Sequence, residues 1–237
     1  MASANRDAEK GQVETLDNGG TAIGTSSAAY GTGASDPVSY SSRPSRIANP
    51  APLGLTAFAG TTFILSMYNV GTRGITHPNV VVGMALFGGG LTQFMAGMWD
   101  MARGNVFGGT AFGSYGSFWM AYATIFIPGS GIISTFANPQ EFNNAVGIYL
   151  ITWFMITFFF LLAVLRRHLA FSVLLTTLCI AFIMLAVAEF TGSEGAQKAG
   201  GAFGLIVALI AFYISTSDML KAELRPVVRL PVGLLHD

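Results

Sequence analysis

A long apolar run opens with the stretch Asn49-Pro50-Ala51-Pro52-Leu53-Gly54-Leu55-Thr56-Ala57-Phe58, which decides the fold. An Asn directly before Pro is typical of a helix start, because the Asn side chain caps free amides and Pro has no N–H to leave unpaired. In hydrocarbon every unpaired amide costs several kcal/mol, so a helix that starts at membrane depth needs such a cap or a polar ligand. The stretch therefore predicts either a well-capped helix or a helix end that faces an anion.

The composition is that of a chain that crosses a membrane several times. Hydrophobic residues make up 52% of the chain and charged residues only 10%, whereas about 25% is usual in soluble domains. The formal net charge is zero, so no basic surface invites nucleic acid, and a lipid bilayer is the expected surrounding instead. The single cysteine, Cys179, lies in an apolar segment and excludes an internal disulfide.

From Pro52 onward the chain contains apolar segments that each approach the roughly 20 residues a spanning helix needs. There are six of them, at residues 52–70, 79–99, 110–127, 142–165, 169–190 and 199–219. The expected fold class is therefore an all-α membrane protein with six transmembrane helices, in a domain over residues 46–220, followed by a short C-terminal tail at 221–237. Residues 1–45 are polar and are predicted to be a disordered tail, because they cannot bury enough apolar surface to offset the entropy of ordering.

The distribution of basic residues predicts the orientation of the chain. Six spans place both termini on one side of the membrane. That side holds Arg6, Lys10, Arg43, Arg46, Arg103, Arg166, Arg167, Lys221, Arg225 and Arg229. The opposite side holds only Arg73 and Lys198. By the positive-inside rule both termini are cytoplasmic, and the plasma membrane is the expected location.

Acidic residues occur only near the ends of the segments, at Asp100, Glu189 and Asp218. Each is expected to be a carboxylate in contact with water at the membrane interface. Asp100 is the best candidate for a proton relay, because it follows Gln93 by seven residues and shares that helix face.

The other polar residues within the segments are uncharged and predict a path for a small anion. Asn49, Thr61, Gln93, Thr110 and Ser114 are the candidates for this pathway. Hydroxyls, amides and helix N-termini can pass an anion without holding it tightly, and conduction requires weak or multiple sites. The alternative is that the hydroxyls bond to carbonyls of their own helices.

Nothing in the segments indicates an enzyme. No Ser-His-Asp or Cys-His arrangement is evident there, and the three histidines lie in loops or the tail, too dispersed to hold a metal. No cofactor is expected. Glycines at helical spacing, as in Gly109-x-x-x-Gly113 and Gly200-x-x-x-Gly204, instead predict close helix packing in lipid.

Two long motifs resemble those of one known family. The first is N-P-A-P-L-G-L-x-x-F at residues 49–58, and the second is G-N-V-F-G-G-T-A-F-G-S-Y-G-S-F-W at residues 104–119, where Val106 replaces the usual Thr. Over roughly residues 47–220 the chain is similar to the acetate uptake transporters, also called succinate–acetate permeases. Its long polar tail resembles fungal members more than bacterial ones.

The resemblance implies a six-helix protomer with its own pore, assembled into a homohexamer. It also implies a hydrophobic constriction midway along the pore, made by residues that match Phe58, Tyr115 and Leu178. Asp100 stands where the family usually has Glu. If it has the family's proton-coupling role, its carboxyl group lies closer to the helix backbone, because the Asp side chain is shorter than that of Glu.

The expected function is transport of acetate and related short-chain monocarboxylates, with succinate as a further substrate, by proton-coupled or channel-like passage. Two alternatives stay open: export of ammonium or ammonia, and sensing of acetic acid at the membrane. Passage of ammonium would require acidic or aromatic cation sites inside the spans. In this chain the acidic residues occur only at the ends of the spans. The sensor is supported only by the polar tail.

Overall fold

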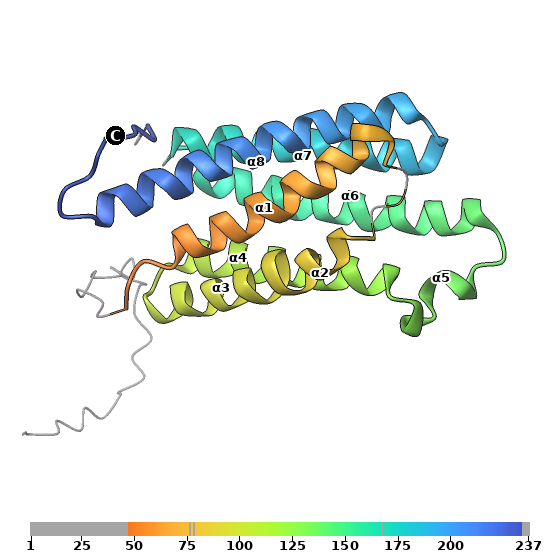
Figure 1. Ribbon diagram of the computed structural model, residues 1–237, viewed down its shortest axis with the longest axis horizontal. Helices are drawn as coiled ribbons and strands as arrows, with labels where there is room; N and C mark the ends of the chain where they lie inside the picture. Colours follow the sequence, from red (N-terminus) through yellow and green to blue (C-terminus); the bar gives the residue numbers. More distant parts are fainter. Residues whose placement is uncertain (1–46, 76, 78, 167, 234–237) are drawn as a thin grey trace, which may run out of the picture. The chain divides into compact units, whose positions relative to one another are not determined.

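A computed structural model describes residues 47–75, 77, 79–166 and 168–233. The tail predicted at residues 1–45 lies outside these ranges, as does His236. The described residues form a bundle of long helices joined by short turns, with no strand among them (Figure 1). The all-α fold class predicted from the sequence is confirmed.

The helices that follow the predicted apolar segments are α1 (Ala51–Asn69), α2 (Val81–Leu86), α3 (Gln93–Ala102), α4 (Val106–Phe126), α6 (Pro139–Val164), α7 (Leu169–Thr191) and α8 (Glu194–Ala222). The short α2 continues into α3 and together they cover one segment. A π-helix, η2 (Phe87–Thr92), joins α2 to α3, and the short connecting elements are η1 (Thr72–Gly74), η3 (Pro128–Ser130) and α5 (Ile132–Thr135).

Among the described helices, five stretches are long and apolar enough to cross a membrane: α1, α2 to α3, α6, α7 and α8. Helix α4 has 21 residues and no Asp, Glu, Lys or Arg, but it is rich in Gly, Ser, Thr and Tyr. Many of its residues are buried against other helices, so α4 does not need an apolar surface on every side. The sixth span stays a prediction.

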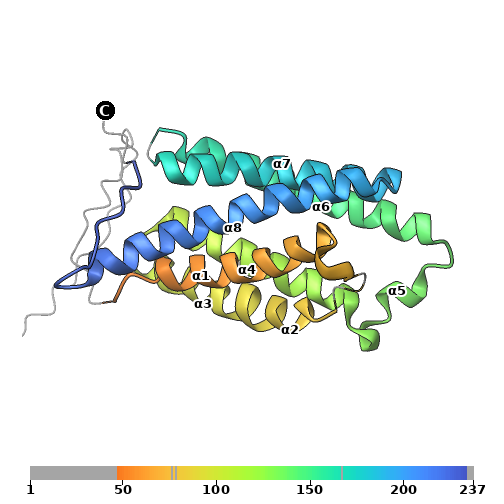
Figure 2. The same ribbon diagram turned by 45° about the horizontal axis from the view of Figure 1, so that its top comes forward.

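The helices run side by side and alternate in direction (Figures 1 and 2). Helix α1 packs against α8, α3 packs against α4, and α7 packs against both α6 and α8. The end of the bundle that holds Asn49, Arg103 and Arg166 is called the terminal end below. The end that holds Arg73, Pro128 and Gly192 is called the distal end.

Hydroxyl groups join α1 to α8. The Ser215 hydroxyl donates to the Pro52 carbonyl at 2.8 Å, and the Thr56 and Ser215 hydroxyl oxygens lie 2.7 Å apart. Side-chain hydrogen bonds between helices help to hold a bundle in lipid, where lipid tails are as apolar as the side chains.

Small residues allow α3 and α4 to approach closely. A Cβ atom added at Gly97 would lie 2.5 Å from the Gly113 amide nitrogen and 3.0 Å from the Gly109 carbonyl oxygen. The sequence prediction that Gly109 and Gly113 serve close packing is therefore confirmed.

The π-helix between α2 and α3 differs from the uninterrupted apolar segment expected at residues 79–99. It contains Gly88, Gly89 and Gly90. A Cβ atom at Gly89 would lie 2.7 Å from the Trp119 ring, and one at Gly90 would lie 2.5 Å from the Ala85 carbonyl oxygen. Glycines thus permit both the extra residue in the turn and the contact with α4.

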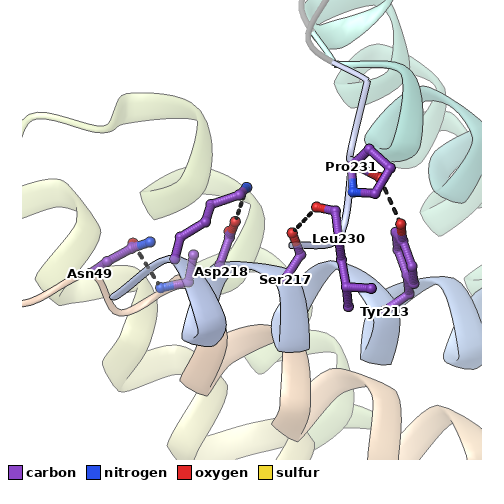
Figure 3. A network of polar contacts seen from close by, with 8 residues as sticks. Asn49, Tyr213, Ser217, Asp218, Leu230 and Pro231 are labelled. Carbon is purple, nitrogen blue, oxygen red and sulfur yellow. Dashed lines mark hydrogen bonds and ion pairs between the residues drawn. The ribbon is translucent and has the colours of Figure 1, made fainter. Parts of the chain in front are cut away.

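The end of the described chain docks onto α7 and α8 rather than extending away from them. The Ser217 and Tyr213 hydroxyls donate to the Leu230 and Pro231 carbonyls, each at 2.7 Å (Figure 3). The first amides of α7 donate to the Val232 and Gly233 carbonyls. The Val232 and Gly233 carbonyls therefore satisfy amides at the N-terminus of α7 that have no partner within their own helix.

We predict that Gly97→Ala destabilises the protein and that Gly83→Ala does not. The methyl group that Gly97→Ala adds would meet the α4 backbone, and overpacking of this kind costs ~1–3 kcal/mol. A Cβ atom at Gly83, also in a helix, would have no heavy atom within 4 Å. The test is the thermal unfolding midpoint in detergent, and equal midpoints for the two variants would contradict the close α3–α4 contact.

Candidate functional site

A cavity of about 530 Å³ opens at the terminal end of the bundle. We call it the terminal cavity. Its polar lining residues are Asn49, Gln93, Asp100, Asn105, Arg166, His168 and Asp218. Towards the middle of the bundle its wall becomes apolar, with residues that include Leu55, Phe58, Ala111, Tyr115 and Leu175.

A second cavity, of about 80 Å³, lies towards the distal end. We call it the distal cavity. Its polar lining residues are Thr62, Ser66, Asn69, Tyr115, Tyr122, Glu189 and Gln197. Its apolar wall includes Phe118, Trp119, Leu150, Leu178 and Ala181.

Phe58 and Tyr115 line both cavities and therefore lie between them. Their ring centroids are 5.6 Å apart, and each side chain is only 5% exposed. Leu178 is equally buried and lines the distal cavity, while Leu175, one turn earlier on α7, lines the terminal cavity. Phe58 and Tyr115 thus lie where the two cavities come together, and Leu178 lies in the lining of the distal one.

The ring of Tyr115 is fixed by residues of α6. Its hydroxyl oxygen lies 2.9 Å from the buried Thr157 hydroxyl. Trp153 and Phe160 pack against the ring, with centroid distances of 6.1 and 5.8 Å. Sequence analysis did not identify Thr157, because one Thr in an apolar helix has no pattern that distinguishes it from others.

The structure brings together some of the predicted pathway residues and not others. Asn49 and Gln93 line the terminal cavity. Thr61 lines neither cavity, and its hydroxyl donates to the Ala57 carbonyl at 2.9 Å. Thr110 is exposed and Ser114 is half-buried, and neither lines either cavity.

The expectation that Asp100 would be exposed to water is wrong. Its side chain has no exposed surface, because Gly108 of α4 lies directly against the carboxylate. As the seven-residue spacing predicts, Asp100 and Gln93 line the same cavity. The Arg103 guanidinium lies 3.6 Å from Asp100 and compensates its charge.

Arg103 also connects the signature motif to α3. Its Nη1 donates to Asn49 Oδ1 at 2.7 Å, and the same oxygen accepts a longer bond from the Ala51 amide at 3.2 Å. The Asn49 side chain therefore accepts a hydrogen bond from the first amide of α1, although Pro50 and not Asn49 stands at the N-cap position, and Arg103 holds it at the terminal cavity.

Each cavity is lined by buried polar atoms that have no hydrogen-bond partner among the described residues. In the terminal cavity these include Gln93 Oε1 and both carboxylate oxygens of Asp100, and in the distal cavity they are Thr62 Oγ1 and Trp119 Nε1. A buried polar group without a partner is costly and is accepted where a ligand or water can supply one. Sequence analysis selected Thr61, whereas its neighbour Thr62 lines the cavity.

Comparison with known proteins gives a match over most of the chain. Residues 31–234 match the sequence profile of the GPR1/FUN34/yaaH family. This range contains every helix described above and both motifs on which the resemblance was based.

Three curated relatives illustrate the match. Ammonia transport outward protein 2 of Saccharomyces cerevisiae is 47% identical over 169 residues, which are 71% of this chain and 60% of the relative. Acetate permease A of Emericella nidulans is 46% identical over 179 residues, 71% of this chain and 60% of the relative. The succinate-acetate/proton symporter SatP of Escherichia coli is 34% identical over 192 residues, 81% of this chain and 98% of the relative. The chain thus spans 60% of the length of these two fungal relatives.

A solved structure of the bacterial acetate channel SatP has the same fold. It superposes with a TM-score of 0.70 at 33% sequence identity and covers 79% of this chain and all of that one. The resemblance to acetate uptake transporters is therefore confirmed.

We predict that the Tyr115–Thr157 contact behaves as a coupled pair. Thr157→Val leaves the buried Tyr115 hydroxyl without a partner and should cost ~1–3 kcal/mol of unfolding free energy. Adding Tyr115→Phe removes that hydroxyl, so the double variant should be at least as stable as Thr157→Val alone. Chemical unfolding in detergent measures the cycle, and strictly additive losses would show that the two groups are independent.

Proposed function

The chain belongs to the GPR1/FUN34/yaaH family, and on that premise we propose that it carries acetate and related short monocarboxylates, succinate included, across a membrane. The observation that carries this proposal is the pair of cavities that approach one another from opposite ends of the bundle and meet at Phe58 and Tyr115. A path with a water-accessible cavity on each side of a short dry region suits a small solute. The names of the fungal acetate permease and the bacterial acetate channel support acetate as the substrate.

The terminal cavity has the chemistry of a weak anion site. Arg166, His168 and the Asn105 side chain line it, and its two carboxylates are compensated by cations: Asp100 by Arg103 and Asp218 by Lys221 at 2.8 Å. An acetate ion can therefore enter without meeting an uncompensated negative charge, and it exchanges between several polar groups rather than binding one tightly.

Phe58, Tyr115 and Leu178 would act as the selective part of the path. A dry apolar ring excludes solutes by their size and by the cost of removing water from a carboxylate. Acetate passes with few waters, whereas lactate brings a further carbon and a hydroxyl group. Neighbouring polar groups, the amide N–H of Gln93 on one side and the hydroxyl of Thr62 on the other, can each donate to the carboxylate as water is lost.

The assembly and the orientation belong to the same proposal. A homohexamer with one pore in each protomer follows from the family resemblance. The described basic residues at the terminal end, Arg103, Arg166, Lys221, Arg225 and Arg229, outnumber Arg73 and Lys198 at the distal end, which supports cytoplasmic termini in the plasma membrane.

We predict saturable uptake of radiolabelled acetate by proteoliposomes that contain only this protein, faster at mildly acidic pH. A monocarboxylic acid titrates near pH ~4–5, as side-chain carboxyls do, so acidity raises both the proton supply and the neutral form. Flux no greater than in empty liposomes at neutral pH, where the anion needs a path, would refute transport. Ammonium flux without acetate flux would favour the exporter, and acetate binding without any flux would favour the sensor.

We predict that Leu178→Ala and Phe58→Ala raise the ratio of lactate to acetate uptake while acetate flux is preserved. The first change removes three carbons from the constriction, and the second removes more. Ile214→Ala is a matched control, because it also removes three carbons from a buried side chain but lines neither cavity.

All three truncations should cost ~2–5 kcal/mol of stability, so uptake is measured per folded assembly. If the ratio stays the same in the constriction variants, or rises equally in Ile214→Ala, these residues do not form the selective part of the path.

A further inference from the structure

The two cavities differ in how their acidic residues are compensated. In the terminal cavity Asp100 and Asp218 each form an ion pair with a cation of their own helix end. Among the described residues that line the distal cavity, Glu189 is the only charged one, and none of them is Lys, Arg or His. No hydrogen bond or ion pair to the Glu189 carboxylate forms within the part of the chain that the structure describes.

The groups that line the distal cavity with Glu189 come from four other helices, and none of the described ones carries a formal charge. Helix α4 contributes the phenols of Tyr115 and Tyr122, α8 contributes the amide of Gln197, and α1 and α6 contribute no titratable side chain to the lining. Lys198 at the same end already pairs with Glu194 at 3.3 Å. The negative charge of Glu189 is therefore uncompensated in a narrow cavity that an anion would have to cross.

A second feature of the same cavity indicates a ligand. Thr62 is only 7% exposed, and its hydroxyl has no hydrogen-bond partner. It lies one turn after Phe58 on α1 and lines the distal cavity together with Glu189. A carboxylate in this cavity could accept a hydrogen bond from Thr62, but ionised Glu189 would repel it at short range.

From this arrangement we propose that Glu189 is a proton-controlled gate of the distal cavity. The ionised side chain excludes monocarboxylate anions. When Glu189 takes up a proton from the solution at the distal end, the repulsion disappears, and its O–H becomes a hydrogen-bond donor to the entering carboxylate. The proton returns to the same solution when the cavity empties, so the gate by itself requires no net proton transport. This inference rests on the proposed carboxylate transport and specifies its regulation.

The test is exchange of radiolabelled acetate in proteoliposomes that have the same pH and acetate concentration on both sides. Equal pH removes the driving force of a proton gradient, and exchange does not depend on how the protein is oriented. Rates are measured from about pH 5 to about pH 8, and the rate in empty liposomes is subtracted at each pH.

We expect exchange by the unmodified protein to fall at least roughly tenfold over this range. In Glu189→Gln, which keeps the shape and removes the charge, we expect a fall of less than about twofold and faster exchange than the unmodified protein near neutral pH. Glu141→Gln is the matched control: it removes an exposed carboxylate in the first turn of α6, at the same end, that lines neither cavity and leaves the Lys198–Glu194 pair intact, and it should keep the full pH dependence.

Three outcomes would overturn the gate. They are an unchanged pH profile in Glu189→Gln, a uniform loss of exchange at every pH, and an equal flattening in Glu141→Gln. If Glu189→Gln does not assemble, Glu189→Ser removes the same charge with a smaller side chain and is read by the same criteria. If the unmodified protein itself exchanges no acetate above the background of empty liposomes, it is the transport proposal that fails.

Discussion

The contact between Phe58 and Tyr115 is the constraint on which the rest of the structure depends. Both side chains line the terminal cavity and the distal cavity, so the contact lies between them. If the protein carries acetate as proposed, an open water path would let ions and protons leak, whereas a thick apolar barrier would stop acetate as well. Two aromatic rings make the dry region short, and their position is fixed because the Tyr115 hydroxyl is bonded to Thr157 and Trp153 packs beside the ring.

The helices around this contact are arranged so that it can be narrow. Glycines let α3 and α4 approach closely, with Gly97 against Gly113. The π-helix at 87–92 brings Gly89 against Trp119, beside the distal cavity. At the terminal end, Arg103 binds Asn49, just before the start of α1, and compensates the charge of Asp100 in the cavity wall. These residues therefore form one polar network. Packing and electrostatics are therefore linked through a few residues of α1, α3 and α4.

Much of this could be predicted from the sequence, because the relevant signals are local. Apolar length located the helices, Asn49 before Pro50 located the start of α1, and two motifs led to Phe58 and Tyr115. The features that were missed depend on contacts between helices. Asp100 is near a segment end, which suggested exposure, but Gly108 and Arg103 bury and compensate it.

Helix rotation explains another difference. Thr61 and Thr62 are adjacent and chemically identical, and only the packing of α1 decides that Thr62 lines a cavity while Thr61 bonds to its own helix.

Side-chain accessibility gives the most direct test of the central claim, which is that Phe58 and Tyr115 separate two cavities open to opposite faces. In a Cys179→Ala background, Ala111→Cys places a thiol in the terminal cavity and Ala181→Cys places one in the distal cavity. With a membrane-impermeant thiol reagent larger than acetate, the first should react only from the terminal side and the second only from the distal side. Reaction of either thiol at equal rates from both sides would contradict the account.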